Sequence, residues 1–195
     1  LVYVDTGSMY RAMALSCIRQ GIKAEEHEKV AQAVKDLNIS LEYEDGVQQV
    51  ILNGENVNAY IRTEEVGNMT SAIAAYGEVR ERLVDMQQAI ARQKDVIMDG
   101  RDIGTCVLKD APVKIYLTAA PRTRAERRYL ELKEKGQECD IDTIEKDIID
   151  RDYRDMHREI SPLKQAEDAI LVDSSDMTIQ QVVDAISDII RERIS

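Results

Sequence analysis

Two carboxylates, a guanidinium group and two glycines lie within one seven-residue stretch, Asp99-Gly100-Arg101-Asp102-Ile103-Gly104-Thr105. The stretch follows Val96-Ile97-Met98, an apolar run typical of a buried strand. In parallel α/β sheets, ligands bind outside the carboxyl ends of the strands, so charged and glycine-rich residues have a chemical use there. A carboxylate directly after a buried strand is also how phosphoryl-transfer enzymes hold Mg²⁺ or its waters. The alternative for this stretch alone is a solvated turn with a helix cap.

Positive charge is concentrated in arginines further along the chain. Arginine makes up sixteen of the 26 basic residues. Its planar guanidinium group suits bidentate capture of phosphate. The net charge of −11 argues against a nucleic-acid backbone or an anionic membrane as partner. The pattern predicts a small, multiply phosphorylated ligand, and seven of the arginines lie close together: Arg122, Arg124, Arg127, Arg128, Arg151, Arg154 and Arg158.

Length and composition are those of a soluble protein with one core domain, since 195 residues are 44% hydrophobic and 32% charged. No apolar stretch approaches the roughly 20 residues of a membrane span, and no signal-peptide pattern opens the chain. Cys17, Cys106 and Cys139 lack metal-ligand spacing, so we interpret them as reduced thiols in a cytoplasmic protein. A zinc site or Ser-His-Asp triad is not expected from His27 and His157, which we predict to lie at the surface.

Strand and helix patterns alternate along the chain, which favours an α/β fold with a mostly parallel, doubly wound sheet. The predicted strands of this sheet are short apolar runs at residues 1–4, 95–98, 113–117 and 169–172. The final helix begins with Thr178 and Gln181 at the spacing of a capping box. Its apolar stripe is predicted to lie in the core and comprises Ile179, Val182, Val183, Ile186, Ile189 and Ile190.

A different periodicity interrupts this alternation from Ser40 to about Tyr60. Apolar residues there recur at every second position, and Asp45-Gly46 and Asn53-Gly54 are turn signals. The segment is therefore predicted to be a small antiparallel meander.

Five motifs in matching order and spacing resemble bacterial cytidylate kinases. The meander resembles the nucleotide-monophosphate-binding insertion of that family, here at residues 40–62. The resemblance implies the nucleoside monophosphate kinase fold, with core segments at 1–39, 63–123 and 159–195 and a lid region at 124–158. The motifs are Asp5-Thr6-Gly7-Ser8-Met9-Tyr10-Arg11, Ile61-Arg62-Thr63-Glu64-Glu65-Val66, the stretch from Asp99 to Thr105, Arg124-Ala125-Glu126-Arg127-Arg128 and Arg151-Asp152-Tyr153-Arg154-Asp155.

This resemblance implies transfer of the γ-phosphoryl group of ATP, with Mg²⁺, to CMP or dCMP. It also implies a monomer, with no nucleic-acid or membrane partner. Family roles then fall on matching positions. Thr6 is expected to contact the monophosphate, Arg11 and Arg101 to bind its oxygens, and Asp99 to hold the metal through water. The cytosine readers would be Ser71, Arg80 and Asp102, the ribose and phosphate contacts of the lid Arg151, Asp155 and Arg158, and the cations at the transferring phosphoryl group Arg101, Arg127, Arg128, Arg151 and Arg158.

Each of these roles has a structural alternative. Arg80 could form an exposed ion pair along its helix, and Ser71 could be a small residue at a helix contact. Arg127 and Arg128 could lie on a solvated helix face. Asp155 could serve only to neutralise neighbouring arginines.

The family begins with a strand, a G-x-x-x-x-G-K-[ST] phosphate-binding loop and a helix, and no such loop occurs in these 195 residues. We therefore expect a truncated form that is inactive for lack of the loop, whose lysine and hydroxyl would hold the phosphates and Mg²⁺ of ATP. The absent strand is expected to lie centrally in the sheet. Two other functions stay open: a noncatalytic CMP-binding module, or a kinase of another small metabolite such as shikimate or UMP.

Overall fold

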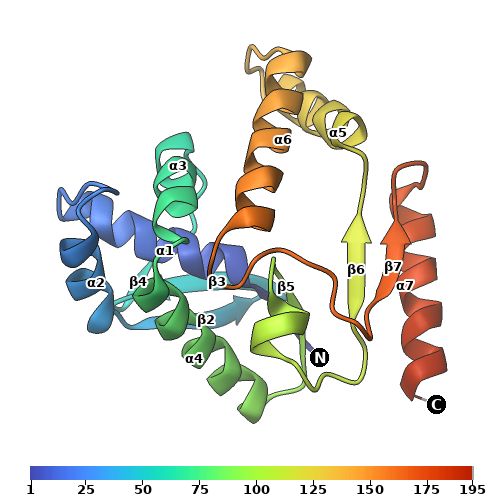
Figure 1. Ribbon diagram of the computed structural model, residues 1–195, viewed down its shortest axis with the longest axis horizontal. Helices are drawn as coiled ribbons and strands as arrows, with labels where there is room; N and C mark the ends of the chain where they lie inside the picture. The colour runs from blue at the N-terminus through green and yellow to red at the C-terminus, as the bar shows by residue number, and fades with distance from the viewer. Residues whose placement is uncertain (195) are drawn as a thin grey trace. The chain divides into compact units, whose positions relative to one another are not determined.

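The computed structural model describes residues 1–194, which form two compact units, Leu1–Ile103 and the chain from Gly104 onward (Figure 1). In the first unit β1 (Val2–Asp5) pairs in parallel with β5 (Val96–Asp99). In the second, β6 (Ile115–Thr118) pairs in parallel with β7 (Ile170–Asp173). The α/β class with parallel strands is confirmed. Among the described residues, however, β1–β5 and β6–β7 are separate two-stranded sheets, because no strand pairs with both of them.

The first unit is built around α1 (Thr6–Arg19), ten of whose residues are buried. Asp5 caps its first turn by accepting from the Ser8 N–H at 3.1 Å. The helix is followed by Gly21, whose positive φ of 69° suits the left-handed turn after a helix. There the Ile22 N–H donates to the Cys17 carbonyl, which satisfies a carbonyl group of the last turn.

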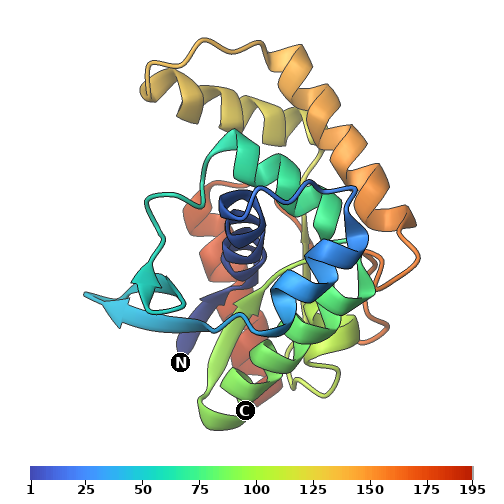
Figure 2. The same cartoon turned by 90° about the vertical axis from the view of Figure 1, so that its left-hand side faces the viewer.

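The segment after α2 (His27–Lys35) forms an antiparallel sheet of β2 (Ile39–Glu44), β3 (Val47–Leu52) and β4 (Glu55–Asn56). Both of its predicted turns are present, and all four of their residues have positive φ, as tight hairpin turns require. Figure 2 shows these strands lying beside the N-terminal strand. We call β2–β4 the meander.

Two further helices complete the first unit, α3 (Glu64–Ile73) and α4 (Gly77–Gln93). The predicted break near Tyr76 is confirmed, because Tyr76 is extended and precedes the first turn of α4. Thr63 caps α3 by accepting from the Val66 N–H. The apolar faces of both helices belong to the core that surrounds α1.

The second unit begins within η1 (Ile103–Val107), a single π-helical turn. It contains α5 (Pro121–Glu134), α6 (Ile141–His157) and α7 (Ile179–Ile194). Ion pairs join α5 to α6. Arg124 donates through both terminal nitrogens to the Asp152 carboxylate, and Arg122 contacts Asp142 and Glu145 at 2.7 and 2.9 Å. The two helices therefore form a hairpin held by charged side chains (Figure 1).

The capping box of α7 is confirmed in both directions. The Thr178 N–H donates to the Gln181 side-chain oxygen at 2.8 Å, and the Gln181 N–H donates to the Thr178 hydroxyl at 3.3 Å. The prediction that the apolar stripe lies in the core is wrong, because no described residue of α7 is buried, and Ile179 is 86% exposed and Val183 50% exposed. Ile179 lies in the first turn of α7 and Val183 one turn later, and neither is covered within the second unit.

Both histidines are exposed, as predicted. Among residues 1–194, no helix combines the length and apolar character that a membrane crossing requires.

Core burial in the first unit gives a direct stability test. Leu83 on α4 is 0% exposed, so Leu83→Ala leaves a cavity and is expected to lower the free energy of unfolding by about 2–5 kcal/mol. Denaturant titration followed by circular dichroism measures this loss. Leu130→Ala, at a helical leucine that is 60% exposed, is the matched control. Equal losses in the two variants would contradict the assigned core.

Candidate active site at the ends of β1 and β5

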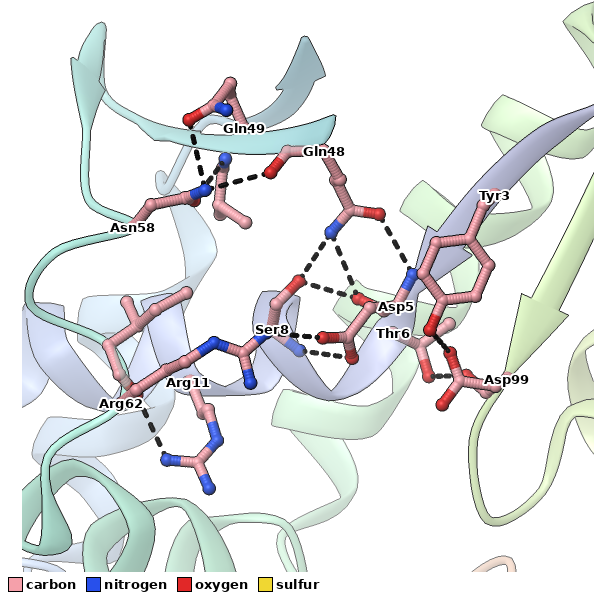
Figure 3. Close-up of polar contacts among 12 residues, drawn as sticks. Tyr3, Asp5, Thr6, Ser8, Arg11, Gln48, Gln49, Asn58, Arg62 and Asp99 are labelled. Atoms are coloured by element: carbon pink, nitrogen blue, oxygen red, sulfur yellow. Dashed lines mark hydrogen bonds and ion pairs between the residues drawn. The ribbon is translucent and has the colours of Figure 1, made fainter. Parts of the chain in front are cut away.

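The parallel register sets Asp5 level with Asp99 at the carboxyl ends of adjacent strands. The Thr6 hydroxyl donates to the Asp99 carbonyl at 2.7 Å and is buried with the rest of its side chain (Figure 3). The Tyr3 hydroxyl donates to the Asp99 carboxylate at 2.8 Å. The first turn of α1 and the loop after β5 are thus joined at one point.

Gly100 is required at that junction because of its close contacts. A Cβ on Gly100 would lie 2.5 Å from the Thr6 hydroxyl oxygen and 2.9 Å from side-chain carbons of Ile103. Any larger residue would push the Thr6 hydroxyl away from the Asp99 carbonyl. The first glycine of the sequence motif therefore has a packing reason.

The pKa of Asp99 is raised above its ordinary value, chiefly because the carboxyl group is withdrawn from water. The negative charge of Asp5 acts in the same direction, while the hydrogen bond from Tyr3 opposes it. The pKa of Tyr3 is raised in turn, first by desolvation and then by Asp99. Asp99 is exposed as a residue, and its carboxylate accepts the hydrogen bond from Tyr3 at the end of β5.

Residues of the second motif, 61–66, contact residues of the first motif, 5–11. Arg11 donates to the Ile61 carbonyl at 3.0 Å, and Arg62 pairs with the Asp5 carboxylate at 3.2 Å. Figure 3 shows both guanidinium groups beside α1. One predicted phosphate ligand, Arg11, is therefore held by a backbone carbonyl, which restricts its rotamers.

Arg80 and Asp102 form a buried ion pair, at 3% and 5% residue exposure. Arg80 also donates to the Ala74 carbonyl at 2.9 Å, and its guanidinium carbon lies 5.5 Å from the centre of the Tyr10 ring. The buried Arg80 Nε–H has no hydrogen-bond acceptor among the described residues. The exposed helical ion pair considered for Arg80 is excluded by this burial.

The other predicted residues of the first unit take simpler positions. Ser71 lies on α3 and is partly buried, while Arg101 is exposed in the loop between Asp99 and Asp102.

The predicted lid residues belong to the second unit. Arg127 is an exposed residue of α5, and its guanidinium group donates to the carbonyls of Ser174 and Met177 at 2.6 and 3.3 Å. Arg128 pairs with Glu131 on its own helix at 2.7 Å, with half of its side chain exposed. The contacts of Arg127 join α5 to the loop between β7 and α7.

Asp155 on α6 stands between two of the predicted cations. It contacts Arg158 at 3.3 Å and Arg151 at 4.0 Å. Arg158 also donates to the Ser161 carbonyl at 2.7 Å. The structure thus brings together the three residues predicted to act on ribose and phosphate.

Three contributions were missed by sequence reasoning. Arg62 pairs with Asp5 across 57 positions, Arg124 joins α5 to α6, and Gln48 contacts the start of α1. Arg62 and Arg124 stand inside the recognised motifs, which was a usable signal. Gln48 carried none.

Carboxylate oxygens are suitable ligands for Mg²⁺ beside Asp99. Among residues 1–194, no group of three or more His, Cys, Asp or Glu side chains is placed to hold a metal ion. Mg²⁺ is commonly bound by one or two carboxylates together with waters and substrate phosphates. Asp99, with Asp5 level beside it, fits that limited requirement.

Parallel strands with carboxylates and guanidinium groups at their carboxyl ends define a class, the phosphate-binding α/β proteins. A family model described as cytidylate kinase matches residues 1–192. The chain belongs to the cytidylate kinase family, whose members are phosphotransferases.

Relatives cover nearly all of the chain. The cytidylate kinase of Caldicellulosiruptor saccharolyticus is 48% identical over 182 residues, 93% of this chain and 80% of that protein. That of Leuconostoc mesenteroides is 47% identical over 194 residues, 100% of this chain and 87% of that protein. That of Clostridium perfringens is 48% identical over 187 residues, 96% of this chain and 84% of that protein.

The raised pKa of Asp99 predicts a pH-dependent stability. Folding disfavours the ionised carboxylate, so the stability contribution of Asp99 is full below its unfolded pKa and is lost as pH rises through its folded pKa. Asp99→Asn should therefore be more stable than the wild type at pH 7, with the difference shrinking toward pH 3. Denaturant unfolding across this pH range measures it, with Asp85→Asn at an exposed carboxylate of α4 as control. A difference that grows as pH falls would contradict the assignment.

Proposed function

We propose that this chain supplies the acceptor side of a (d)CMP kinase, which transfers the γ-phosphoryl group of ATP to CMP or dCMP. The Arg80–Asp102 pair carries the proposal, because it offers a buried carboxylate and a buried guanidinium donor in one place. Cytosine has an amino donor at N4 and acceptors beside it. Uracil would instead turn a carbonyl oxygen toward the carboxylate, which repels it.

The phosphate end of CMP is proposed to lie at the turn that begins α1. Thr6 would contact the phosphate there, and Arg11 and Arg101 would bind its oxygens through charge-assisted hydrogen bonds. Ser71 would contact the base from α3. Residues 40–62, which include most of the meander, would be the monophosphate-binding insertion.

Residues 124–158 are proposed to be the lid, with Arg127, Arg128, Arg151 and Arg158 stabilising the transferring phosphoryl group and Asp155 holding ribose. Cations placed where charge develops act mainly in the transition state. Mg²⁺, when bound near Asp99, would neutralise phosphate charge. The protein is proposed to act as a cytoplasmic monomer on free nucleotides, without nucleic acid or membrane.

Separation of binding from catalysis gives the first test. The 195 residues contain these acceptor groups but no phosphate-binding loop of the G-x-x-x-x-G-K-[ST] type. The chain as given is therefore expected to bind CMP in isothermal titration and to form no CDP with ATP and Mg²⁺. Fusion of a strand, such a loop and a helix ahead of Leu1 should produce CDP. Substantial CDP formation by the 195-residue chain would refute the proposed inactivity, and absence of CMP binding would refute the acceptor site.

Base recognition gives the second test. Asp102→Asn removes the negative charge that attracts the cytosine amino group and adds an amide that can donate to uracil O4. The preference for CMP over UMP, taken as the ratio of dissociation constants, should fall about 5- to 150-fold, the equivalent of about 1–3 kcal/mol. Asp99→Asn, at the end of β5, is the matched control and should leave the ratio unchanged. Equal weakening of both nucleotides by Asp102→Asn would show that the carboxylate only organises the loop.

A further inference from the structure

One edge of β1 pairs with β5, and the other is covered by side chains of the meander. The Val2 N–H donates to the Asp95 carbonyl, so the backbone groups of even-numbered β1 residues face β5. Those of Tyr3 and Asp5 point to the opposite edge. There the Tyr43 hydroxyl donates to the Tyr3 carbonyl at 2.8 Å, and the Gln48 side-chain oxygen accepts from the Asp5 N–H at 2.9 Å.

Tyr43 and Gln48 are cross-strand partners in the register of β2 and β3. The pair supplies one donor and one acceptor to the β1 edge, which a neighbouring strand would otherwise supply. Only Gln48 reaches further. Its amide nitrogen donates to the Ser8 hydroxyl at 2.7 Å and lies 3.5 Å from the Asp5 carbonyl (Figure 3).

The bonds of Gln48 converge on the turn that begins α1. Asp5 caps the helix through its carboxylate, and the Ser8 hydroxyl donates back to the Asp5 carbonyl at 2.6 Å. Thr6 stands between these two residues, with its hydroxyl fixed on the Asp99 carbonyl. A displacement of the Asp5–Ser8 turn therefore displaces Thr6.

The position of Gln48 is itself fixed within the meander. Asn58 donates to the Gln48 carbonyl at 2.8 Å and accepts from the Val50 N–H at 2.8 Å. The side chain of Gln49 points elsewhere, accepting from Asn56 and Asn58. Adjacent residues of β3 thus have separate tasks, since Gln49 bonds inside the meander and Gln48 bonds to the start of α1.

We propose that Gln48 is a positioning residue for phosphate binding, by which the meander sets the geometry of the Asp5–Ser8 turn. The inference rests on the proposed function, because it assumes that Thr6 meets the phosphate of CMP. Gln48 itself touches neither phosphate nor base. Its loss should therefore weaken recognition of the phosphate and leave recognition of the base unchanged.

The test compares CMP with cytidine, which lacks the phosphate, as ligands of the 195-residue chain. Gln48→Met keeps the length of the side chain and removes its hydrogen bonds. It should weaken CMP about 3- to 10-fold, the loss expected for one or two hydrogen bonds, and leave the dissociation constant of cytidine unchanged. Gln49→Met, the matched control, should change neither value. Gln48→Asn, whose amide is one methylene shorter, should repeat the result and serves if the Met variant fails to fold.

Amide hydrogen exchange without ligand gives a second, independent readout. The Asp5 amide should exchange faster in Gln48→Met than in the wild type, while the Gln49→Met chain should match the wild type. Equal weakening of CMP and cytidine, or an unchanged CMP affinity, would overturn the positioning role. The proposed function would be refuted instead if Gln48→Met speeds exchange of the Asp5 amide but the wild-type chain does not prefer CMP to cytidine.

Discussion

The candidate site of the first unit depends on the parallel register of two short strands. Because Asp5 is level with Asp99, α1 begins beside the point where the loop after β5 begins. The Thr6 hydroxyl can then reach the Asp99 carbonyl, and Gly100 keeps the space that this contact needs. A slip of one residue would turn each side chain of the strand to the other face of the sheet. It would also separate the start of α1 from the start of the loop after β5, and no later adjustment of α1 could bring them together again.

Two of the arginines predicted to bind the ligand are held in different ways. Arg11 is held by a backbone carbonyl, whereas Arg80 is held by both a carbonyl and the Asp102 carboxylate. A guanidinium group fixed before binding loses less rotamer freedom when it meets its ligand. The burial of Arg80 with Asp102 has a desolvation cost, since both charges leave water. Such a pair is useful where the ligand presents a donor and an acceptor side by side.

Sequence patterns predicted the features that depend on neighbouring residues. The turns at Asp45-Gly46 and Asn53-Gly54 need positive φ, and the box of Thr178 and Gln181 needs a spacing of three, so each can be read locally. The candidate site residues were predicted from motifs, and the structure joins two of these motifs, because Arg62 pairs with Asp5 and Arg11 donates to the Ile61 carbonyl.

Contacts decided by tertiary packing could not be read in that way. Gln48 stands in an ordinary strand pattern, and its task appears only when β3 lies against the end of β1. The stripe of α7 shows the converse error, because a periodic apolar face does not say whether anything covers it. Ile179 follows the pattern and is 86% exposed. Periodicity therefore fixed the kind of element, and only packing fixed its burial.

The two edges of β1 have different physical characters, and this difference bears on how the site is built. Toward β5 the strand is held by a backbone ladder, whose geometry leaves little freedom. Toward the meander it is held by two side chains, Tyr43 and Gln48, whose bonds are each worth about 0.5–1.5 kcal/mol and can adjust through their torsions. Asp99 and the loop after it are thus anchored by the rigid edge. The turn that holds Thr6 is shared between the rigid edge and the adjustable one, so a change in the meander can reach Thr6 without disturbing the strand pair.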